Sequence, residues 1–175
     1  MSDNVVSETG PPVIGEVKLR RERDWSNLCD GDHLAVNIGE TGLWHHGIYN
    51  CFIDDKGCTK HFVYHVTGDG KDQAAIVCDQ FFDFYANRTV LFVLDYPEGG
   101  RTAEKIIAKA KKLYENKASW GKYSTLSNNC EHFATYCKAG KKKSAQAEVW
   151  VTMALKAVVN ECRGTKSSGC LSSCC

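Results

Sequence analysis

Three short segments of the 175-residue chain carry side chains that could do nucleophilic chemistry. The first contains His45 and His46, the second His65 and the third Cys130. Cys130 follows the polar residues 127–129 and precedes apolar residues at helical spacing, so we expect it at the start of a helix. A thiol there meets the positive end of the helix dipole and free backbone N–H groups. These groups favour the thiolate and could bind a developing oxyanion.

A thiol nucleophile needs a base, and two predicted strands carry imidazoles. Alternation places His45 and His46 on opposite faces of the strand 43–52. If the strand over residues 62–66 pairs with it, His45 and His65 lie side by side, on the face where the thiol-bearing helix packs. One imidazole would take the thiol proton and the other would fix its tautomer, which is the orienting role in a catalytic triad. A purely structural role for all these residues stays open, because most cysteines at helix starts and most strand histidines only pack.

A metal-binding alternative uses one member of the same set. The spacing C-x6-C-x2-H-x3-H is formed by Cys51, Cys58, His61 and His65. Its first gap exceeds the two to four residues usual in zinc fingers, so we predict no metal site. The other histidines are predicted to be structural or on the surface; these are His33, His46, His61 and His132.

The elements that must position these residues are strands in the first half of the chain and helices in the second. Alternating or apolar runs predict strands over residues 34–38, 43–52, 62–66 and 89–94, with a hairpin turn at 54–57. Residues 79–85 are aromatic-rich and fit a short helix packed on the sheet. Helical spacing predicts three helices in the second half. The first has Thr102 as its N-cap, the second runs from residue 129 or 130 to Gly140, and the third covers residues 144–162. Strands followed by helices predict an α+β domain, with an antiparallel sheet packed with helices.

The domain limits follow from composition. Residues 1–20 lack periodicity and are expected as a flexible N-terminal arm. Residues 21–140 form the predicted catalytic domain, and residues 141–175 a C-terminal helix and a cysteine-rich tail.

Bulk composition narrows the function classes. Hydrophobic residues make up 43% of the chain, enough for a core without disulfides, and the net charge of +1 gives no field that would attract nucleic acid. The first nine residues lack the basic and apolar regions of a signal peptide, and no stretch reaches 18 apolar residues. We therefore expect a cytoplasmic protein whose ten cysteines are reduced.

The reactive segments resemble those of the lecithin:retinol acyltransferase domain family, and in particular its small phospholipase A/acyltransferase enzymes. The resemblance covers residues 30–140 and rests on four segments: Gly31-Asp32-His33-Leu34, His45-His46-Gly47-Ile48-Tyr49 (the H-box), Val63-Tyr64-His65-Val66, and Asn129-Cys130-Glu131-His132-Phe133 (the NC box). The order His, His, Cys is the reverse of papain's. The resemblance therefore implies a circularly permuted papain-like core.

The resemblance implies Cys130 as nucleophile, His45 as general base and His65 as the residue that orients His45. It implies phospholipase A1/A2 and acyltransferase activity through a thioester on Cys130, with a glycerophospholipid or other acyl ester as donor. The acceptor would be water, an amine, a lysolipid or an alcohol, and no metal or cofactor is implied. The chain departs from the family after Tyr49, where Asn50-Cys51-Phe52-Ile53 replaces the usual glycines. It departs again at residues 149–159, which are too short to span a membrane.

The C-terminal tail predicts peripheral attachment to a membrane surface. Its small polar residues include Cys170, Cys174 and Cys175, and Lys138 and residues 141–143 lie upstream. One acyl chain plus basic charge holds a protein on a membrane, so we hypothesise S-acylation of these cysteines. The apolar side of the helix 144–162 could lie on lipid, although packing on the core is the commoner fate.

Two other function classes stay open. A non-catalytic regulator could keep the same scaffold for protein binding, and a cysteine peptidase or amidase could use the same nucleophile. Trapping of an acyl-enzyme would exclude the regulator, and cleavage of peptides without cleavage of phospholipid would favour the peptidase. The sequence makes no prediction of oligomeric state, of head-group preference or of the acyl acceptor.

Overall fold

The computed structural model describes residues 10–68, 75–97 and 101–164. Within these ranges one antiparallel sheet has the strand order β1-β6-β2-β3-β4-β5. The strands are β1 (Lys18–Glu22), β2 (His33–Asn37), β3 (Trp44–Ile53), β4 (Thr59–Thr67), β5 (Ala75–Gln80) and β6 (Leu91–Asp95). The helices are α1 (Phe81–Tyr85), α2 (Ala103–Glu115), α3 (Cys130–Ala139) and α4 (Ala145–Gly164). The α+β prediction is confirmed.

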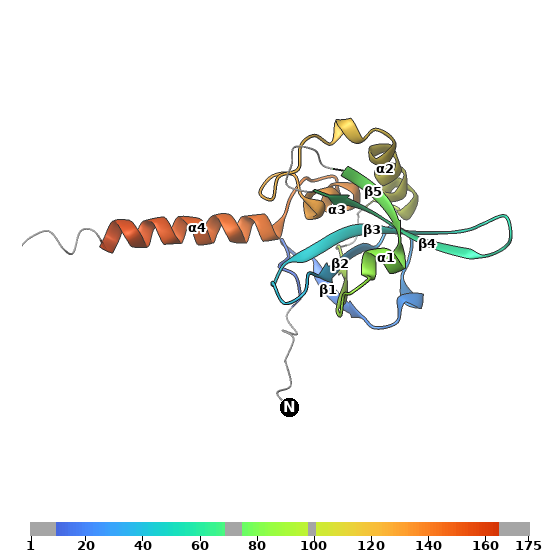
Figure 1. Ribbon diagram of the computed structural model, residues 1–175, viewed down its shortest axis with the longest axis horizontal. Helices are drawn as coiled ribbons and strands as arrows, with labels where there is room; N and C mark the ends of the chain where they lie inside the picture. The colour runs from blue at the N-terminus through green and yellow to red at the C-terminus, as the bar shows by residue number, and fades with distance from the viewer. Residues whose placement is uncertain (1–9, 69–74, 98–100, 165–175) are drawn as a thin grey trace, which may run out of the picture.

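Helices cover both faces of the sheet (Figure 1). Helices α2 and α3 lie on one face, where Ile48 and Tyr64 pack with Phe133. Helix α1 covers the other face, where Tyr49 and Val63 pack with its buried aromatic rings. Alternate residues of β3 and β4 therefore enter two different cores, as the period of two in a strand requires.

The hairpin between β3 and β4 sets the register that matters for the histidines. The Asp54 carboxylate accepts the N–H groups of Lys56 and Cys58, both at 2.9 Å, and Gly57 takes the left-handed conformation with φ of 76°. The turn at 54–57 is thus as predicted. Antiparallel pairing then runs from Ile53 opposite Thr59 to Gly47 opposite His65.

Two strands were not predicted. Strand β1 begins inside the segment expected as an arm, and it pairs with β6 at the edge of the sheet. Strand β5 lies directly before α1, and it takes in the first two residues, 79 and 80, of the segment expected as a short helix. Both are edge strands with few fully buried residues, so neither has a strong apolar alternation to reveal it.

Helix α4 projects away from the domain (Figure 1). Its first turn is docked, with Ala145 and Ala147 buried, but Trp150, Met153 and Leu155 beyond it are each more than half exposed. Of the two fates considered for its apolar side, packing on the core is limited to the first turn, because the helix leaves the domain after it. Over the described residues, no helix is long and apolar enough to cross a membrane.

Candidate active site

Helix α3 begins at Cys130 because the residues around it form a capping box. The Asn129 side chain accepts the N–H of His132 at 3.0 Å, and the His132 ring accepts the N–H of Asn129 at 3.3 Å. An imidazole here does the work of the usual Glu or Gln. The spacing of Asn, Cys and His in this segment is therefore what fixes the thiol at the first helical position.

Cys130 is buried, with 6% of its surface exposed. Its sulfur lies 4.0 Å from the carbonyl oxygen of Trp44 in β3. Burial raises the pKa of the thiol to about 11, although hydrogen bonds from the backbone N–H groups of His46, Glu131 and Cys130 itself act to lower it. The resting side chain is thus a neutral thiol in a cradle of N–H groups, the surroundings that a thiolate or an oxyanion would need.

The two predicted histidines are in contact. His45 Nε2 lies 2.9 Å from His65 Nδ1, and the rings meet edge to face. Both rings also pack against Phe84 of α1. Gly47 makes room for this packing, because a Cβ there would overlap Val63 and press on Phe84. The prediction that His45 and His65 lie side by side is confirmed.

Asp79 in β5 continues the contact between the rings. Its Oδ2 lies 3.0 Å from His65 Nε2, and about half of the carboxylate side chain is exposed. An ionised carboxylate only accepts hydrogen bonds, so His65 Nε2 must carry a proton and His65 Nδ1 must accept one from His45 Nε2. His45 Nδ1 is then left as a bare acceptor, and no partner contacts it among the described residues.

Burial keeps both imidazoles neutral. It lowers the pKa of His45 to about 3, with a further contribution from repulsion by His65. Burial also lowers the pKa of His65, although the Asp79 carboxylate opposes this. A neutral imidazole with a free lone pair is the form that a general base must have.

The face assigned to the imidazole pair needs correction. His45 and His65 point to the α1 side of the sheet, whereas Cys130 belongs to the core under α3, the opposite side. β4 pairs with β3 only as far as Gly47 and then continues along β5 alone, so the backbone of β3 before Gly47 has no partner strand on that side. The sulfur of Cys130 lies beside this stretch of β3, 4.0 Å from the carbonyl oxygen of Trp44. No hydrogen bond joins it to His45 in the part of the chain that the structure describes.

Asp79 is a site residue that the sequence analysis missed. It lies in an edge strand whose register could not be read from the sequence, and acidic residues are ordinary in such strands. Asp79 is the one carboxylate in β5, but only the pairing of β5 with β4 in the structure brings it beside His65.

The remaining histidines are placed as structural groups. His33 and His46 are fully buried and bonded to each other, His61 bonds the hydroxyl of Tyr49, and His132 caps α3. In the described ranges no three His, Cys, Asp or Glu side chains converge on a site for a metal ion, so the alternative with C-x6-C spacing has no geometric support. The tail cysteines Cys170, Cys174 and Cys175 lie outside the described residues.

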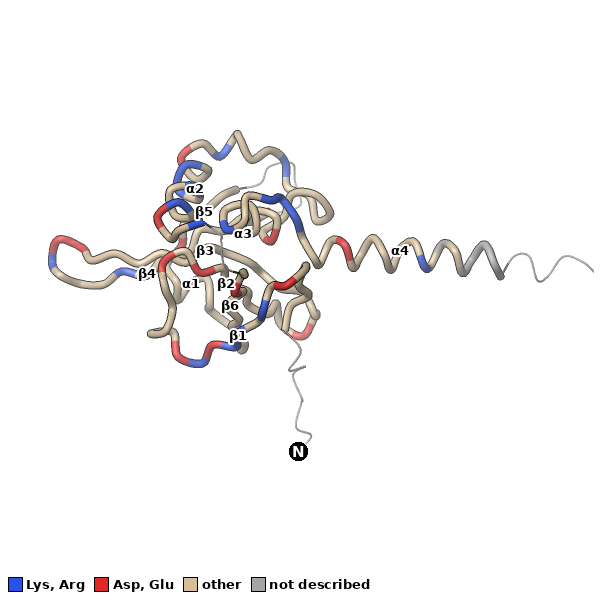
Figure 2. The backbone as a smooth tube through the Cα atoms, turned by 180° about the vertical axis from the view of Figure 1, so that it is seen from behind, with Lys and Arg blue, Asp and Glu red and all other residues tan. Residues whose placement is uncertain are grey.

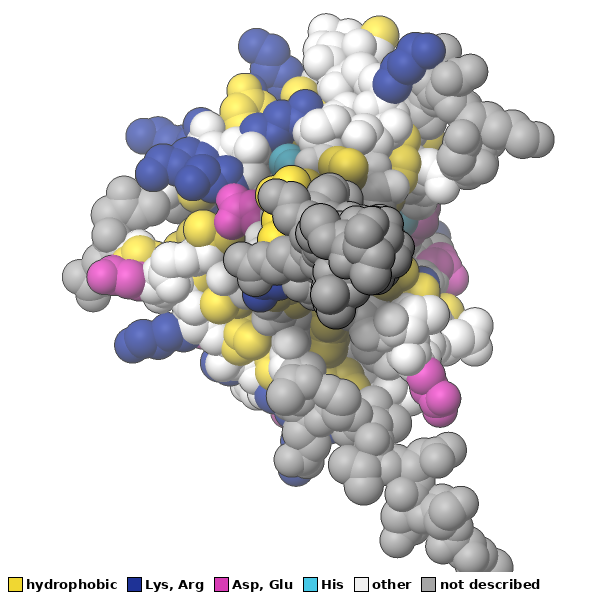
Figure 3. All heavy atoms as spheres, turned by 90° about the vertical axis from the view of Figure 1, so that its left-hand side faces the viewer, with side chains coloured by type: hydrophobic (Ala, Val, Ile, Leu, Met, Phe, Trp, Pro, Cys, Tyr) yellow, Lys and Arg dark blue, Asp and Glu magenta, His cyan; other side chains and the backbone are white. Residues whose placement is uncertain are grey.

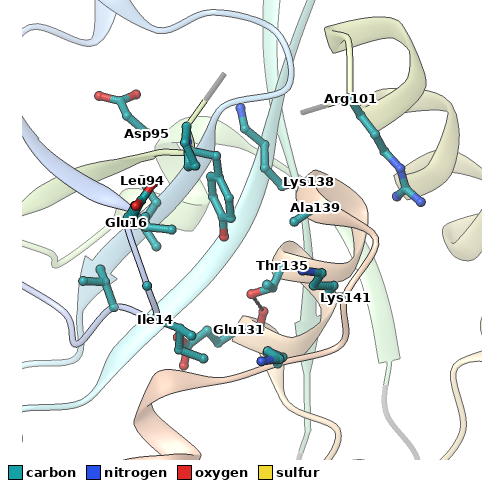
Figure 4. Close-up of a pocket in the computed structure, with 16 residues that line it drawn as sticks. Ile14, Glu16, Leu94, Asp95, Arg101, Glu131, Thr135, Lys138, Ala139 and Lys141 are labelled. Atoms are coloured by element: carbon teal, nitrogen blue, oxygen red, sulfur yellow. Dashed lines mark hydrogen bonds between the residues drawn. The ribbon is translucent and has the colours of Figure 1, made fainter. Parts of the chain in front are cut away.

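A cavity of about 630 Å³ opens on the other side of α3, between this helix and the segment before β1 (Figure 4). Thr135 and Lys138 of α3 line it, with Leu94 and Tyr96 opposite. It includes neither Cys130 nor the imidazole pair, so we do not assign it to the reactive site.

Comparisons with known proteins show which family the chain is similar to. The family model described as lecithin retinol acyltransferase matches residues 26–143. The lecithin retinol acyltransferase of Bos taurus is 30% identical over 166 residues, covering 83% of this chain and 69% of that protein. Its counterpart from Mus musculus is 43% identical over 145 residues, covering 79% and 62%. Phospholipase A and acyltransferase 4 of Homo sapiens is 42% identical over 55 residues, covering 31% and 32%.

No solved structure gives a significant match to the chain. The family match covers more than half of the sequence and includes all three predicted catalytic residues. The chain belongs to the lecithin retinol acyltransferase family, whose named relatives are acyltransferases and a phospholipase A.

Proposed function

We propose that this member of the lecithin retinol acyltransferase family transfers acyl groups from glycerophospholipids through a thioester on Cys130. His45 is the general base, and His65 orients it. Hydrolysis by this route is a phospholipase A1/A2 reaction, and transfer to an amine, lysolipid or alcohol is an acyltransferase reaction. The names of the relatives support the reaction class, and the arrangement of these three side chains supports the route.

A single observation carries the proposal. The hydrogen bonds from His45 to His65 and from His65 to Asp79 all run in one direction and leave His45 Nδ1 free. The residues on either side of His45 in β3 are the ones whose backbone faces the sulfur of Cys130. The proposed route requires this free nitrogen and the thiol to come within hydrogen-bond reach during attack.

The acylation half-reaction follows from this arrangement. The Cys130 thiol gives its proton to His45 Nδ1 as the sulfur attacks the ester carbonyl carbon, and the carbonyl oxygen becomes an oxyanion among the backbone N–H groups. The intermediate collapses when the carbon–oxygen bond to glycerol breaks. The imidazolium then gives its proton to the departing oxygen, so a lysophospholipid leaves and a thioester remains.

The second half-reaction runs the same steps in reverse. An acceptor hydroxyl or amine gives its proton to His45 as it attacks the thioester carbonyl. The sulfur leaves and takes the proton back from His45. The product is a fatty acid when the acceptor is water, and an ester or amide otherwise.

The protonation states support proton transfer during attack over a preformed ion pair. With the thiol pKa near 11 and the His45 pKa near 3, both groups are neutral in the closed site. Asp79 stabilises positive charge through His65 once the proton has moved, because it is the nearest acceptor in the series. The proposal therefore gives Asp79 a supporting role.

We also propose that the protein works on the cytoplasmic surface of a membrane. Helix α4 exposes Trp150, Met153 and Leu155, which suit a helix lying at a lipid interface. Lysines at residues 141–143 join α3 to α4 (Figure 2), and Figure 3 shows hydrophobic side chains beside Lys and Arg on the face from which α4 projects. S-acylation of Cys170, Cys174 and Cys175 would add to this attachment. Changing all three to Ser should reduce the membrane-bound fraction of the protein, and an unchanged fraction would contradict the acylation.

The order of the catalytic residues leads to a proposal on the origin of the fold. A helix that begins with the nucleophile and packs on strands bearing the base is the arrangement of papain. Here the histidines precede the cysteine. We propose that the domain is a circularly permuted form of that core.

One observation favours a second candidate, a regulator that keeps the scaffold without turnover. Cys130 is 6% exposed, and its thiol is neutral at rest. A lipid carbonyl must open the site before it can reach the sulfur. A protein that never opens would bind partners and acylate nothing.

Turnover of phospholipid vesicles separates the two candidates. We expect the protein to release fatty acid and lysophospholipid from phosphatidylcholine vesicles, and Cys130→Ala to abolish the release. Cys137→Ala is the matched control, since this buried thiol lies two turns along the same helix and away from the imidazoles. Equal release from wild type and Cys130→Ala would exclude the thioester route, and no release from folded wild type would favour the regulator.

A further inference from the structure

The first turn of α4 is bonded to both elements that flank the thiol. Glu131 follows Cys130 in α3, and its buried carboxylate accepts the hydroxyl of Ser144 at 2.6 Å and the N–H groups of Ala145 and Gln146 at 2.9 and 3.1 Å. A carboxylate that satisfies free N–H groups at a helix start also matches the helix dipole. The α4 terminus is therefore fixed to the residue next to the nucleophile.

Gln146 reaches from the same turn to the strand of the base. Its Oε1 accepts the N–H of Trp44 at 2.9 Å, and its Nε2 donates to the carbonyl oxygen of Trp44 at 3.2 Å. These are the two backbone groups that a paired strand would satisfy. Because β4 has left β3 at this point, the amide of Gln146 takes the place of the missing strand.

The orientation of the amide also fixes a tautomer. A flipped amide would set two oxygens and two N–H donors against one another at Trp44, so the nitrogen must be the atom that faces His46 Nε2 at 3.0 Å. His46 Nε2 accepts, and His46 Nδ1 carries the proton that it donates to His33 at 2.9 Å. The backbone of β3 from Trp44 to His46 is held by these bonds, and His45 lies between them.

We propose that Gln146 is a positioning residue for the reaction at Cys130. By holding Trp44 and His46, it sets where His45 lies and where the N–H of His46 points relative to the sulfur. The inference rests on the proposed function and extends the site to α4. Docking of the α4 first turn becomes a condition for assembly of the site.

The groups around the sulfur make the role of Gln146 measurable through the pKa of the Cys130 thiol. Glu131 acts against ionisation of the thiol, Tyr123 lies near it, and the N–H of His46 acts for ionisation. Loss of the Gln146 contacts frees the β3 edge and weakens the bond from His46. The pKa of the thiol then rises, and its alkylation at a given pH slows.

The test compares Gln146→Met with wild type. Methionine keeps the length of the side chain and leaves Trp44 and His46 without their partners. We expect kcat for a soluble acyl ester to fall by between about tenfold and a hundredfold, as a misplaced base would cause, with KM little changed. We also expect the pH profile of Cys130 alkylation by iodoacetamide to move to higher pH. Glu148→Gln is the control, because it changes an exposed carboxylate in the same first turn of α4 and should alter neither quantity.

Two outcomes would overturn the inference. One is a Gln146→Met protein with lower stability but with wild-type kcat and alkylation profile per folded molecule, since Gln146 would then act on the fold alone. The other comes from wild-type protein, where ¹⁵N NMR should find His46 protonated on Nδ1; protonation on Nε2 would contradict the contact with Gln146. Neither alkylation nor NMR requires turnover, so an inactive wild type would count against the proposed function and leave this inference to be decided by these two readouts.

Discussion

Two hydrogen-bonded pairs of histidines lie on opposite faces of the same sheet. In one, His45 and His65 end on the half-exposed carboxylate of Asp79 and leave His45 Nδ1 without a partner among the described residues. In the other, His33 and His46 are 0% exposed, and all four ring nitrogens are bonded, with Tyr96 and Gln146 at the ends.

The pairs differ more in how many of their ring nitrogens have hydrogen-bond partners than in how deeply they are buried. A buried imidazole with both nitrogens bonded to neutral groups has no lone pair to offer, so it cannot act as a base. A pair that ends on a carboxylate and leaves one nitrogen free can accept a proton and tolerate the resulting charge. The sequence places His45 and His46 side by side, and the hydrogen bonds give them opposite roles.

Replacement of the free nitrogen should have the largest effect. In His45→Gln the amide can still donate to His65, but the base is gone. We expect kcat/KM on phosphatidylcholine vesicles to fall by about 10²- to 10⁴-fold, with little change in the urea midpoint. An active His45→Gln protein would show that another group takes the thiol proton.

Replacement within the other pair should act on stability. His33→Leu leaves the Nδ1 proton of His46 without a partner, while the hydroxyl of Tyr96 keeps its hydrogen bond with Thr135. An unpaired buried group costs about 1–3 kcal/mol, so we expect a loss of about 1–3 kcal/mol in the free energy of unfolding. Urea denaturation measures this loss. The kcat per folded molecule should stay close to wild type. A large fall in kcat would show that the His33–His46 pair also contributes to catalysis.

Loss of the Asp79 charge should have an intermediate effect on activity. In Asp79→Asn the amide can donate to His65 Nε2, which reverses the tautomers and places a proton on His45 Nδ1. We expect a fall in kcat of roughly tenfold to a hundredfold, below the effect in buried triads because Asp79 is half exposed. Asp83→Asn, an exposed change in α1, is the control. Equal activity in the two variants would remove Asp79 from the site.

Low pH should destabilise the fold by protonating the histidines of both pairs. Per histidine, this is the smallest of the effects predicted here. Burial lowers the pKa of His33, His45, His46 and His65 below their unfolded values near 6.5. The unfolded chain therefore binds more protons, so stability is full above pH 6.5 and is lost as the pH falls below it. The slope is at most about 1.4 kcal/mol per pH unit for each histidine. Urea titrations at pH 7, 6 and 5 measure it, and flat stability over this range would contradict burial of neutral rings.

Local sequence patterns predicted most of the secondary structure and the reactive residues. Alternation and turn chemistry gave β2, β3, β4 and β6, and helical spacing gave the last three helices. The capping residues around Cys130 placed the nucleophile at a helix start, and the pairing of two strands placed His45 beside His65.

Long-range features escaped prediction because no local signal encodes them. The point where β4 leaves β3 depends on how far each strand follows its other neighbour, and it leaves the backbone of Trp44 open to Gln146. Asp79 joins the site only through the register of an edge strand. Gln146 lies 102 residues from Trp44, and its role depends on an open strand edge that a sequence pattern does not reveal.

The most direct measurement is the mass of the intact protein after incubation with phosphatidylcholine vesicles. Wild type and Cys130→Ala would be compared with the three tail cysteines changed to Ser in both. We predict a hydroxylamine-labile acyl adduct on the protein that keeps Cys130 and none on the variant. An adduct on both proteins, or no adduct and no released fatty acid from folded protein, would contradict Cys130 as the acyl carrier.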